Sequence, residues 1–230
     1  MTMKSMLGVL LTGALMACSP SGGAAQTTGV PGADNQTEAA PEVPAVASLP
    51  EAQRVEFTIG DGTVLVGTYY PPPAVPAPAL VMVHMLGLDK DSWQPLIGAL
   101  RVEGQPTYAI FAIDLPEHGE SGGTWSERGT LDATVAAIEK LAELEGADPT
   151  RIVIIGASVG ADAAVDVCPE MNCLGAISLS PGGFLGIAHT DGLTYMLNGG
   201  DQPVLCMAAE GDTPSARDCN AGEGVGLSDY

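Results

Sequence analysis

The segment Gly156-Ala157-Ser158-Val159-Gly160 carries the residue whose type and surroundings best suit covalent chemistry. A β-branched apolar run, Arg151-Ile-Val-Ile-Ile155, precedes it, and an Ala-rich segment follows it. This order reads as strand, sharp turn and helix. Such a turn pushes the serine hydroxyl out of the sheet edge, and glycine on both sides lets the neighbouring backbone approach closely. We therefore predict that Ser158 is a nucleophile. The alternative is an incidental serine in a Gly-rich turn.

A serine nucleophile needs a base, and the chain has three histidines, His84, His118 and His189. His84 ends a predicted strand, and His118 lies in the loop after the next predicted strand. His189 lies in a Gly-rich segment between two later strands, and it reaches Ser158 only if that segment folds over the site. The alternative for His189 is an exposed loop position.

The spacing of reactive residues indicates no metal or cofactor chemistry. The chain has no Cys-x-x-Cys or His-Glu-x-x-His spacing for a metal, no dinucleotide glycine fingerprint and no phosphate-binding Gly-Lys-Ser/Thr motif. We expect neither a metal nor a cofactor. The later cysteines are Cys168, Cys173, Cys206 and Cys219, an even number that allows three pairings. We expect a disulfide between Cys168 and Cys173, which would close a short loop. Cys206 is then expected to be a core residue and Cys219 to be free.

The elements that position these residues alternate along the chain. Two alternating runs joined at Asp61-Gly62 predict a β-hairpin, and continuous apolar runs then predict buried strands with helical segments between them. Helical spacing over 131–145 predicts an amphipathic helix with Thr130 as a possible N-cap. This alternation predicts an α/β fold: a mostly parallel sheet with helices on both faces.

Charge and composition limit the partners. Eight Lys and Arg against 28 Asp and Glu give a formal net charge of −20, which repels phosphate backbones, so we exclude nucleic acid as a partner. Residues 1–17 contain Lys4 followed by an apolar run too short to span a bilayer, which predicts an export signal. Residues 18–53 are rich in Pro, Gly and Ala and predict a disordered tether, and residues 54–230 are expected to form the folded domain.

The end of the export signal, Leu15-Met16-Ala17-Cys18, resembles the lipobox of bacterial lipoproteins. The resemblance implies that Cys18 is lipidated on its thiol and becomes the N-terminus of the mature protein. Ser19, rather than Asp, follows it, which in those lipoproteins is compatible with the outer membrane. We therefore expect an exported protein that is anchored to the bacterial cell envelope through the lipid on Cys18. An ordinary signal peptide with a chance cysteine is the alternative.

The folded part resembles the α/β-hydrolase family, in particular its small serine esterases and dienelactone-hydrolase-like members. Three motifs carry the resemblance, in the family's order: His84-Met85-Leu86-Gly87, Asp114-Leu-Pro-Glu-His-Gly-Glu-Ser121, in which Glu117 replaces a usual glycine, and the Ser158 turn. The resemblance implies the α/β-hydrolase fold from about Arg54 to Asp218. It also implies hydrolysis of small-molecule carboxylic esters through an acylated serine.

The same resemblance implies the supporting site residues. Asp212, at the end of a strand-like run, is the implied acid that orients the base, and Glu210 is the alternative. The backbone N–H groups of Val159 and Leu86 are the implied oxyanion hole, with Met85 as an alternative to Leu86.

The family's catalytic histidine follows the acid, and this chain has no histidine after Asp212. Three explanations are open: a reading frame truncated or frameshifted near Cys219, His189 acting as the base, or a protein that has lost hydrolysis and kept a binding pocket. We favour truncation, and hence a C-terminally shortened fold. The alternative function, from a different class, is a noncatalytic envelope lipoprotein or binding module on a hydrolase scaffold.

Overall fold

A computed structural model describes residues 49–102, 107–200 and 202–222 of the chain. The predicted export signal, Cys18 and nearly all of the predicted tether lie outside these residues, as do residues 223–230.

A mixed sheet forms the centre of the described part of the chain. Its strands are β1 (Gln53–Thr58), β2 (Val64–Tyr70), β3 (Ala77–Val83), β4 (Ala109–Ile113), β5 (Ala147–Ala157), β6 (Gly175–Leu179) and β7 (Val204–Met207). Their order across the sheet is β1-β2-β4-β3-β5-β6-β7. β1 and β2 run antiparallel, β2 is antiparallel to β4, and the strands from β4 to β7 pair in parallel. The predicted fold class is confirmed.

The hairpin forms where the sequence predicts it. Gly62, with a φ of 87°, supplies the left-handed backbone conformation at the turn. The carboxylate of Asp61 accepts a hydrogen bond from the N–H of Thr63 at 2.8 Å and closes the turn.

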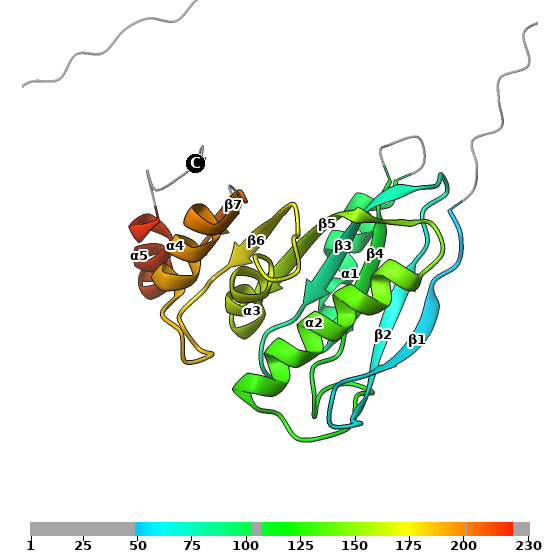
Figure 1. Ribbon diagram of the computed structural model, residues 1–230, viewed down its shortest axis with the longest axis horizontal. Helices are drawn as coiled ribbons and strands as arrows, with labels where there is room; N and C mark the ends of the chain where they lie inside the picture. Colours follow the sequence, from blue (N-terminus) through cyan, green and yellow to red (C-terminus); the bar gives the residue numbers. More distant parts are fainter. Residues whose placement is uncertain (1–48, 103–106, 201, 223–230) are drawn as a thin grey trace, which may run out of the picture. The chain divides into compact units, whose positions relative to one another are not determined.

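Helices cover the two faces of the sheet unequally. The helices are a 3-10 turn η1 (Lys90–Trp93), α1 (Gln94–Leu100), α2 (Glu127–Glu143), α3 (Val159–Val167), α4 (His189–Gly200) and α5 (Thr213–Ala221). α1 lies behind the central strands in Figure 1, whereas α2 and α3 lie in front of the sheet. We refer to these two sides as the α1 face and the α3 face.

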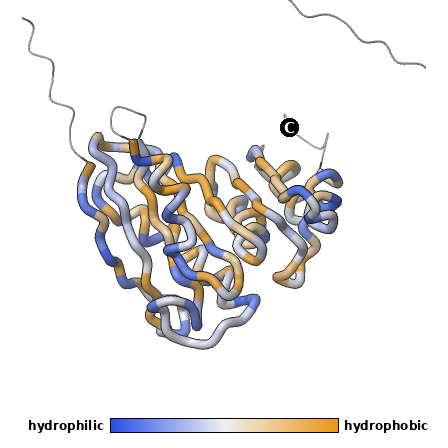
Figure 2. The backbone as a smooth tube through the Cα atoms, turned by 180° about the vertical axis from the view of Figure 1, so that it is seen from behind, coloured by the Kyte–Doolittle hydropathy of each residue, from blue (hydrophilic) through white to orange (hydrophobic). Residues whose placement is uncertain are grey.

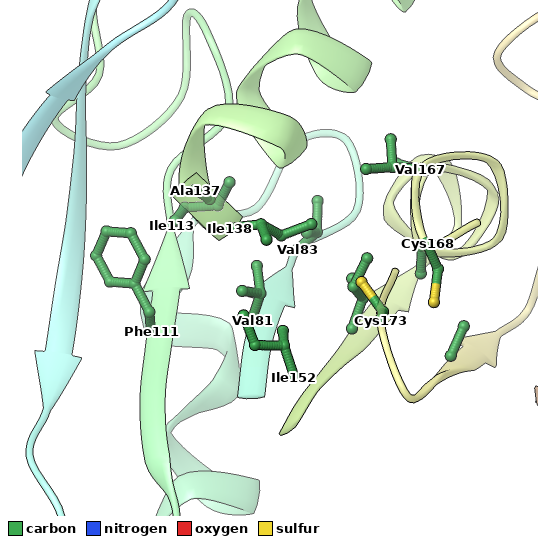
Figure 3. Close-up of a cluster of buried hydrophobic side chains, with 14 of the residues drawn as sticks. Val81, Val83, Phe111, Ile113, Ala137, Ile138, Ile152, Val167, Cys168 and Cys173 are labelled. Atoms are coloured by element: carbon green, nitrogen blue, oxygen red, sulfur yellow. The ribbon is translucent and has the colours of Figure 1, made fainter. Parts of the chain in front are cut away.

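Each face of the sheet has its own hydrophobic core. On the α3 face, Val81, Phe111 and Ile152 form one core with side chains of α2 and α3 (Figure 3). On the α1 face, Met82 and Ile110 pack under Trp93 and Ile97. The central strands are therefore apolar on both sides, as parallel strands require. Much of the tube in the middle of the sheet is orange, the colour of hydrophobic residues, in Figure 2.

Three helices differ from the sequence-based predictions, and one of them is α4, which forms where only a Gly-rich segment around His189 was expected. α2 begins at Glu127 rather than at Leu131, because Ser126 is its N-cap and accepts a hydrogen bond from the N–H of Gly129 at 2.9 Å. α5 was not predicted: the side chain of Asp212 caps its first turn, and Pro214 lies in that turn. No helix in the described ranges is long and apolar enough to cross a membrane.

The disulfide also differs from the expectation. Cys206 in β7 is bonded to Cys219 in α5, whereas Cys168 and Cys173 are both free and buried among hydrophobic side chains (Figure 3). The expected Cys168–Cys173 bond is therefore wrong. Short sequence separation does not decide pairing, because α5 folds back against β7 and brings the more distant cysteines together.

Candidate active site

Ser158 lies at a sharp turn between β5 and α3. Its φ of 53° and ψ of −115° place a non-glycine residue in the left-handed half of conformational space, which costs on the order of 1–3 kcal/mol. The N–H of Ser158 donates to the carbonyl of Leu179 at 2.9 Å and ties the turn to the end of β6. The predicted strand–turn–helix around Ser158 is thus present, with its backbone strained at the serine.

The flanking glycines are required by the close approach of the backbone. A Cβ atom added to Gly156 would overlap the carbonyl group of Gly160, and a Cβ atom on Gly160 would overlap the carbonyl group of Val83. Both obstacles are backbone atoms that cannot rotate away. The first turn of α3 therefore packs directly on the end of β3.

Two histidines fix the loop that follows β3. Nδ1 of His84 donates to the carbonyl of Met85 at 2.8 Å, while its Nε2 accepts from the N–H of Leu115 at 3.0 Å. His84 is fully buried, and this burial lowers its pKa, so the ring is neutral. In the same way, His118 contacts the carbonyl of Pro116 through Nδ1 and accepts from the N–H of Gly87 through Nε2.

A buried ion pair holds the same loop from its other end. Nζ of Lys90 lies 2.8 Å from Oδ2 of Asp114 and 3.0 Å from Oε1 of Glu120. Burial opposes the charge of Lys90, but these two carboxylates outweigh it and raise the pKa of the lysine. The loop after β3 is therefore fastened to the loop after β4.

The two N–H groups predicted to form the oxyanion hole belong to α3 and to the loop after β3. Val159 is the first residue of α3, so no helical carbonyl faces its N–H. Leu86 lies in the loop after β3, and among the described residues no hydrogen bond uses its N–H. Neither N–H therefore has a backbone partner among the described residues, as an oxyanion hole requires, although Val159 itself is buried.

A small pocket of about 230 Å³ adjoins the turn at Ser158 through the preceding residue, Ala157, although Ser158, Val159 and Leu86 do not line it. Its lining includes His84, Met85, Trp93, Ala157, Leu179 and Ser180. These residues come from the loop after β3, from η1, and from the ends of β5 and β6, where ligands bind in open α/β sheets. The pocket is smaller than the roughly 300–1,000 Å³ of sites for drug-sized ligands, so it encloses only a small group.

Asp212 follows β7 and is partly exposed. Its side chain accepts from the N–H of Ser215 at 3.4 Å as the N-cap of α5. The side chains of Ser215 and Ser180 hold the pKa of Asp212 below its ordinary value, so the carboxylate is charged. Because Ser180 also lines the pocket, Asp212 lies near the pocket from the β7 side.

His189 occupies a different place. Its ring is buried, with Nδ1 at 3.0 Å from Oδ1 of Asp162 and Nε2 at 3.3 Å from the hydroxyl of Ser178. Ser178 alternates in β6 with Leu179, which lines the pocket, so the ring lies on the α3 face of the sheet. The structure thus brings His189 to Asp162 rather than to Ser158, and its action as a base remains a prediction that requires this pair to open.

Asp162, one turn after Ser158, has more contacts than an acid at a helix N-terminus needs. Besides His189, its carboxylate accepts from the N–H of Gly182 at 3.3 Å and of Phe184 at 2.6 Å. It therefore fixes the loop between β6 and α4. An acid one turn after Ser158 was the only sequence signal, because its partners lie 20 to 27 residues away.

One turn further along α3, Asp166 is perturbed by the same cluster. Burial and then the charge of Asp162 raise its pKa from 3.8 to about 7, while His189 lowers it and Glu170 adds the smallest increase. Its Oδ2 atom is buried without a hydrogen-bond partner.

Among the described residues, no group of three or more His, Cys, Asp or Glu is arranged to hold a metal ion.

Comparisons with known proteins agree with this geometry. A family model described as "Alpha/beta hydrolase family" matches residues 80–217. The protein YfhR of Escherichia coli (strain K12) is 32% identical over 120 residues, which are 50% of this chain and 41% of that protein. The biotin biosynthesis bifunctional protein BioHC of Cellvibrio japonicus is 35% identical over 105 residues, 45% of this chain and 18% of that protein. The chain thus spans less than half the length of these relatives.

Solved structures show the same fold at low sequence identity. The Pyrococcus furiosus esterase Pf2001 superimposes with a TM-score of 0.60 at 17% identity, covering 76% of this chain and 77% of that one. An alpha-beta hydrolase from Vibrio vulnificus gives a TM-score of 0.55 at 20% identity, covering 75% and 71% of the two chains.

Proposed function

The chain belongs to the alpha/beta hydrolase family, and from this we propose that it hydrolyses small-molecule carboxylic esters with Ser158 as the nucleophile. One observation carries the proposal: Ser158 is held in a strained conformation between two glycines that no larger residue can replace. Strain of this kind persists where the surroundings impose it, and it is concentrated at functional sites.

The proposed reaction has two acyl-transfer steps. The Ser158 oxygen attacks the ester carbonyl carbon, its proton passes to a base, and the N–H groups of Val159 and Leu86 hold the resulting oxyanion. The C–O bond to the alcohol then breaks, and the alcohol leaves with the proton. Water attacks the acyl-serine in the same way, releasing the carboxylic acid and restoring the hydroxyl.

Transfer of the serine proton to a base is the step that we expect to limit the rate. In the structure, both ring nitrogens of every histidine, His84, His118 and His189, face a polar partner. His189 serves as the base only after leaving Asp162. Oxyanion stabilisation and binding alone give about 10³–10⁴-fold acceleration over water, so we expect weak hydrolysis. The occupied histidines also favour the second candidate function, a binding module that does not turn over its ligand.

The test is covalent labelling of the full chain by a fluorophosphonate probe, together with hydrolysis of 4-nitrophenyl acetate. Ser158→Ala removes the hydroxyl, and Ser158→Gly removes it while also relieving the strained φ, so loss of both signals in both variants supports the nucleophile. Thr194→Ala is the control, because its exposed hydroxyl on α4 donates to the carbonyl of Thr190 and does not line the pocket. Labelling that survives in both Ser158 variants refutes the assignment.

The role of His189 is tested in the same assay. His189→Gln keeps a polar side chain of similar size, so the fold has the best chance of persisting. Loss of labelling with an unchanged melting temperature identifies His189 as the base, and unchanged labelling rejects it. A folded wild-type chain that is never labelled supports the binding module.

We also propose that the protein is exported and anchored to the outer membrane through a lipid on Cys18. Support comes from the sequence alone, namely the apolar run and the small residues before Cys18. Mass spectrometry of the N-terminal peptide from a Gram-negative host should show an acylated Cys18. Cys18→Ala should abolish the acylation and move the protein from the membrane fraction to the soluble fraction. A wild-type N-terminus without lipid contradicts the proposal.

A further inference from the structure

The disulfide between Cys206 and Cys219 lies against a buried histidine. Nε2 of His189 is 3.8 Å from Sγ of Cys206 and 3.3 Å from the hydroxyl of Ser178. Cys206 is 8% exposed and His189 is 3% exposed, and Cys206 belongs to the core on the α3 face. An ionisable ring therefore contacts one of the two bonded sulfur atoms inside the protein.

Asp162 determines which ring nitrogen of His189 carries a hydrogen. Its Oδ1 atom is 3.0 Å from Nδ1, and because a carboxylate only accepts, Nδ1 is the donor. In the neutral ring, Nε2 then has no hydrogen and accepts from the hydroxyl of Ser178. Nε2 can therefore take up a proton on the side of the ring that faces the sulfur, and the carboxylate of Asp162 stabilises the imidazolium.

A pocket of about 420 Å³ adjoins both the histidine and the helix that carries Cys219. Its lining includes His189 at the start of α4, and Arg217 and Asp218, which directly precede Cys219 in α5. Cys219 is only partly buried, whereas Cys206 is in the core. Within the described part of the chain, an external thiol thus approaches the bond from its Cys219 end.

We propose that Cys206–Cys219 is a redox-active disulfide that exchanges with external thiols, with Cys206 as the sulfur that leaves beside His189. An external thiolate attacks Sγ of Cys219 and forms a mixed disulfide. The S–S bond breaks, and its electron pair stays on Cys206 as a thiolate. The proton lost by the external thiol is taken up at Nε2 of His189, which gives a thiolate–imidazolium pair.

A second external thiol completes the exchange. Its thiolate attacks the external sulfur of the mixed disulfide, which releases an external disulfide, and its proton converts the Cys219 thiolate into a thiol. Two external thiols are thereby oxidised, and the protein gains two electrons and two protons. The reverse sequence oxidises the protein.

The other two cysteines show what the surroundings of Cys206 add. A hydrogen bond to Cys173, together with burial, raises the pKa of the Cys168 thiol, so this buried pair stays protonated and unreactive. Cys206 is equally enclosed, but it has an imidazole at its sulfur. A positive charge at this point makes Cys206 the better leaving group, because a stabilised thiolate leaves faster. A disulfide with only a structural role needs no such neighbour.

The first test is equilibration of the folded full chain, carrying Cys18→Ser, in mixtures of reduced and oxidised glutathione at pH 7. Thiols are trapped by alkylation, and tryptic cleavage after Arg217 separates Cys219 from the other cysteines. We expect His189→Gln to shift the equilibrium about tenfold towards the disulfide, because a hydrogen bond to a charged thiolate is lost. This shift corresponds to about 30 mV.

Ser178→Ala is the matched variant, because it removes the same hydrogen bond to Nε2 but keeps the imidazole. It should keep the wild-type equilibrium, and so should His118→Gln, whose ring lies in the loop after β4. A wild-type disulfide that stays oxidised at every glutathione ratio overturns the proposal and makes the bond structural. Equal shifts in Ser178→Ala and His189→Gln also overturn it, because they indicate altered packing rather than a lost charge.

The second test detects the thiolate itself by its ultraviolet absorbance. Cys219→Ser leaves Cys206 as a thiol, and subtraction of the Cys206→Ser/Cys219→Ser spectrum cancels the signals of Cys168 and Cys173. We expect thiolate absorbance at pH 6, where an ordinary cysteine, with a pKa of about 8.5, is protonated. Adding His189→Gln to Cys219→Ser should abolish it.

Several other charged groups surround this site, namely Asp162 and Asp166 of α3, Asp191 of α4, and Arg217 and Asp218 of α5. Burial chiefly raises the pKa of Asp166 to about 7, so it titrates in the same range, but a carboxyl does not produce the thiolate absorbance. Thiolate absorbance that appears only above pH 8, or that is unchanged without His189, contradicts the proposal.

Discussion

At the residue scale, the turn around Ser158 depends on the absence of a side chain at the neighbouring glycines. We expect Gly160→Ala to destabilise the protein by about 1–3 kcal/mol or more, because the new methyl group meets the carbonyl of Val83. Gly98→Ala is the control: it lies in α1 with nothing within 4 Å of an added Cβ, so it should stabilise by about 0.5–1 kcal/mol. Urea unfolding of both variants gives the comparison. Equal stabilities would contradict the close packing of α3 on β3.

Asp166 predicts how stability depends on pH. Its folded-state pKa of about 7 lies above the ordinary 3.8, so between these values the folded state binds a proton that the unfolded state has released. This contribution to stability is complete below about pH 4 and disappears as pH rises through 7. At pH 8, Asp166→Asn should therefore raise the free energy of unfolding by on the order of 1 kcal/mol, a small value because the side chain is only partly buried. The melting temperature should rise accordingly.

The measurement is the melting temperature from pH 5 to pH 8, where Asp166→Asn should lose part of the wild-type decline. The groups acting on Asp166 are Asp162, Glu170 and His189. Asp191→Asn serves as the control, since Asp191 is exposed on α4 and should leave the slope unchanged. A parallel profile in Asp166→Asn would show that its carboxyl is already charged at pH 5.

Individual residues also show how far the sequence allowed the site to be predicted. The turn at Ser158 is a local motif, so consecutive residue types were sufficient to predict it. The contact between Asp162 and His189 was not predicted, because it depends on how α4 docks against α3. Glu117, which replaces a glycine of the family motif, adopts a φ of 67°, so the backbone keeps the glycine-like conformation without the glycine.

At the scale of elements, the disulfide holds α5 against β7. It closes a loop with a sequence separation of 13, for which chain entropy gives about 3 kcal/mol of stabilisation. Cys219→Ser should therefore lower the melting temperature by roughly 6–12 °C. The reductant-treated wild type should melt at a similar temperature. Cys173→Ala is the control, and its melting temperature should still fall when reductant is added. A wild type whose melting temperature does not change with reductant would contradict the bond.

Elements were predicted well where hydrophobic patterning was strong. The hairpin and the buried strands follow from alternating and continuous apolar runs, which hold regardless of what packs beside them. α5 was missed because its sequence, Thr213-Pro-Ser-Ala-Arg-Asp-Cys-Asn-Ala221, has little apolar content, and its disulfide to β7 is a tertiary feature. The start of α2 was misplaced because Ser126 precedes the first periodic apolar residue by a full turn.

At the scale of the whole molecule, the net charge of −20 predicts a response to salt. Mutual repulsion of the acidic groups is screened over about 30 Å at 0.01 M salt and about 8 Å at 0.15 M. We expect the melting temperature to rise by a few degrees between 10 and 300 mM NaCl. KBr at equal ionic strength should give a similar rise, which separates screening from ion-specific effects. A fall with both salts would show that exposed attractive pairs such as Arg54–Glu120 dominate instead.

The strained φ of Ser158 has a consequence for how this gene would respond to selection. In a mutational scan scored by protein abundance, glycine should outperform the native serine at position 158, because it adopts the left-handed conformation without cost. A scan scored by ester turnover should reverse that order, while both scans should reject every substitution at Gly156 and Gly160. A lineage freed from the need for catalysis would therefore lose its serine first and keep the glycines around it.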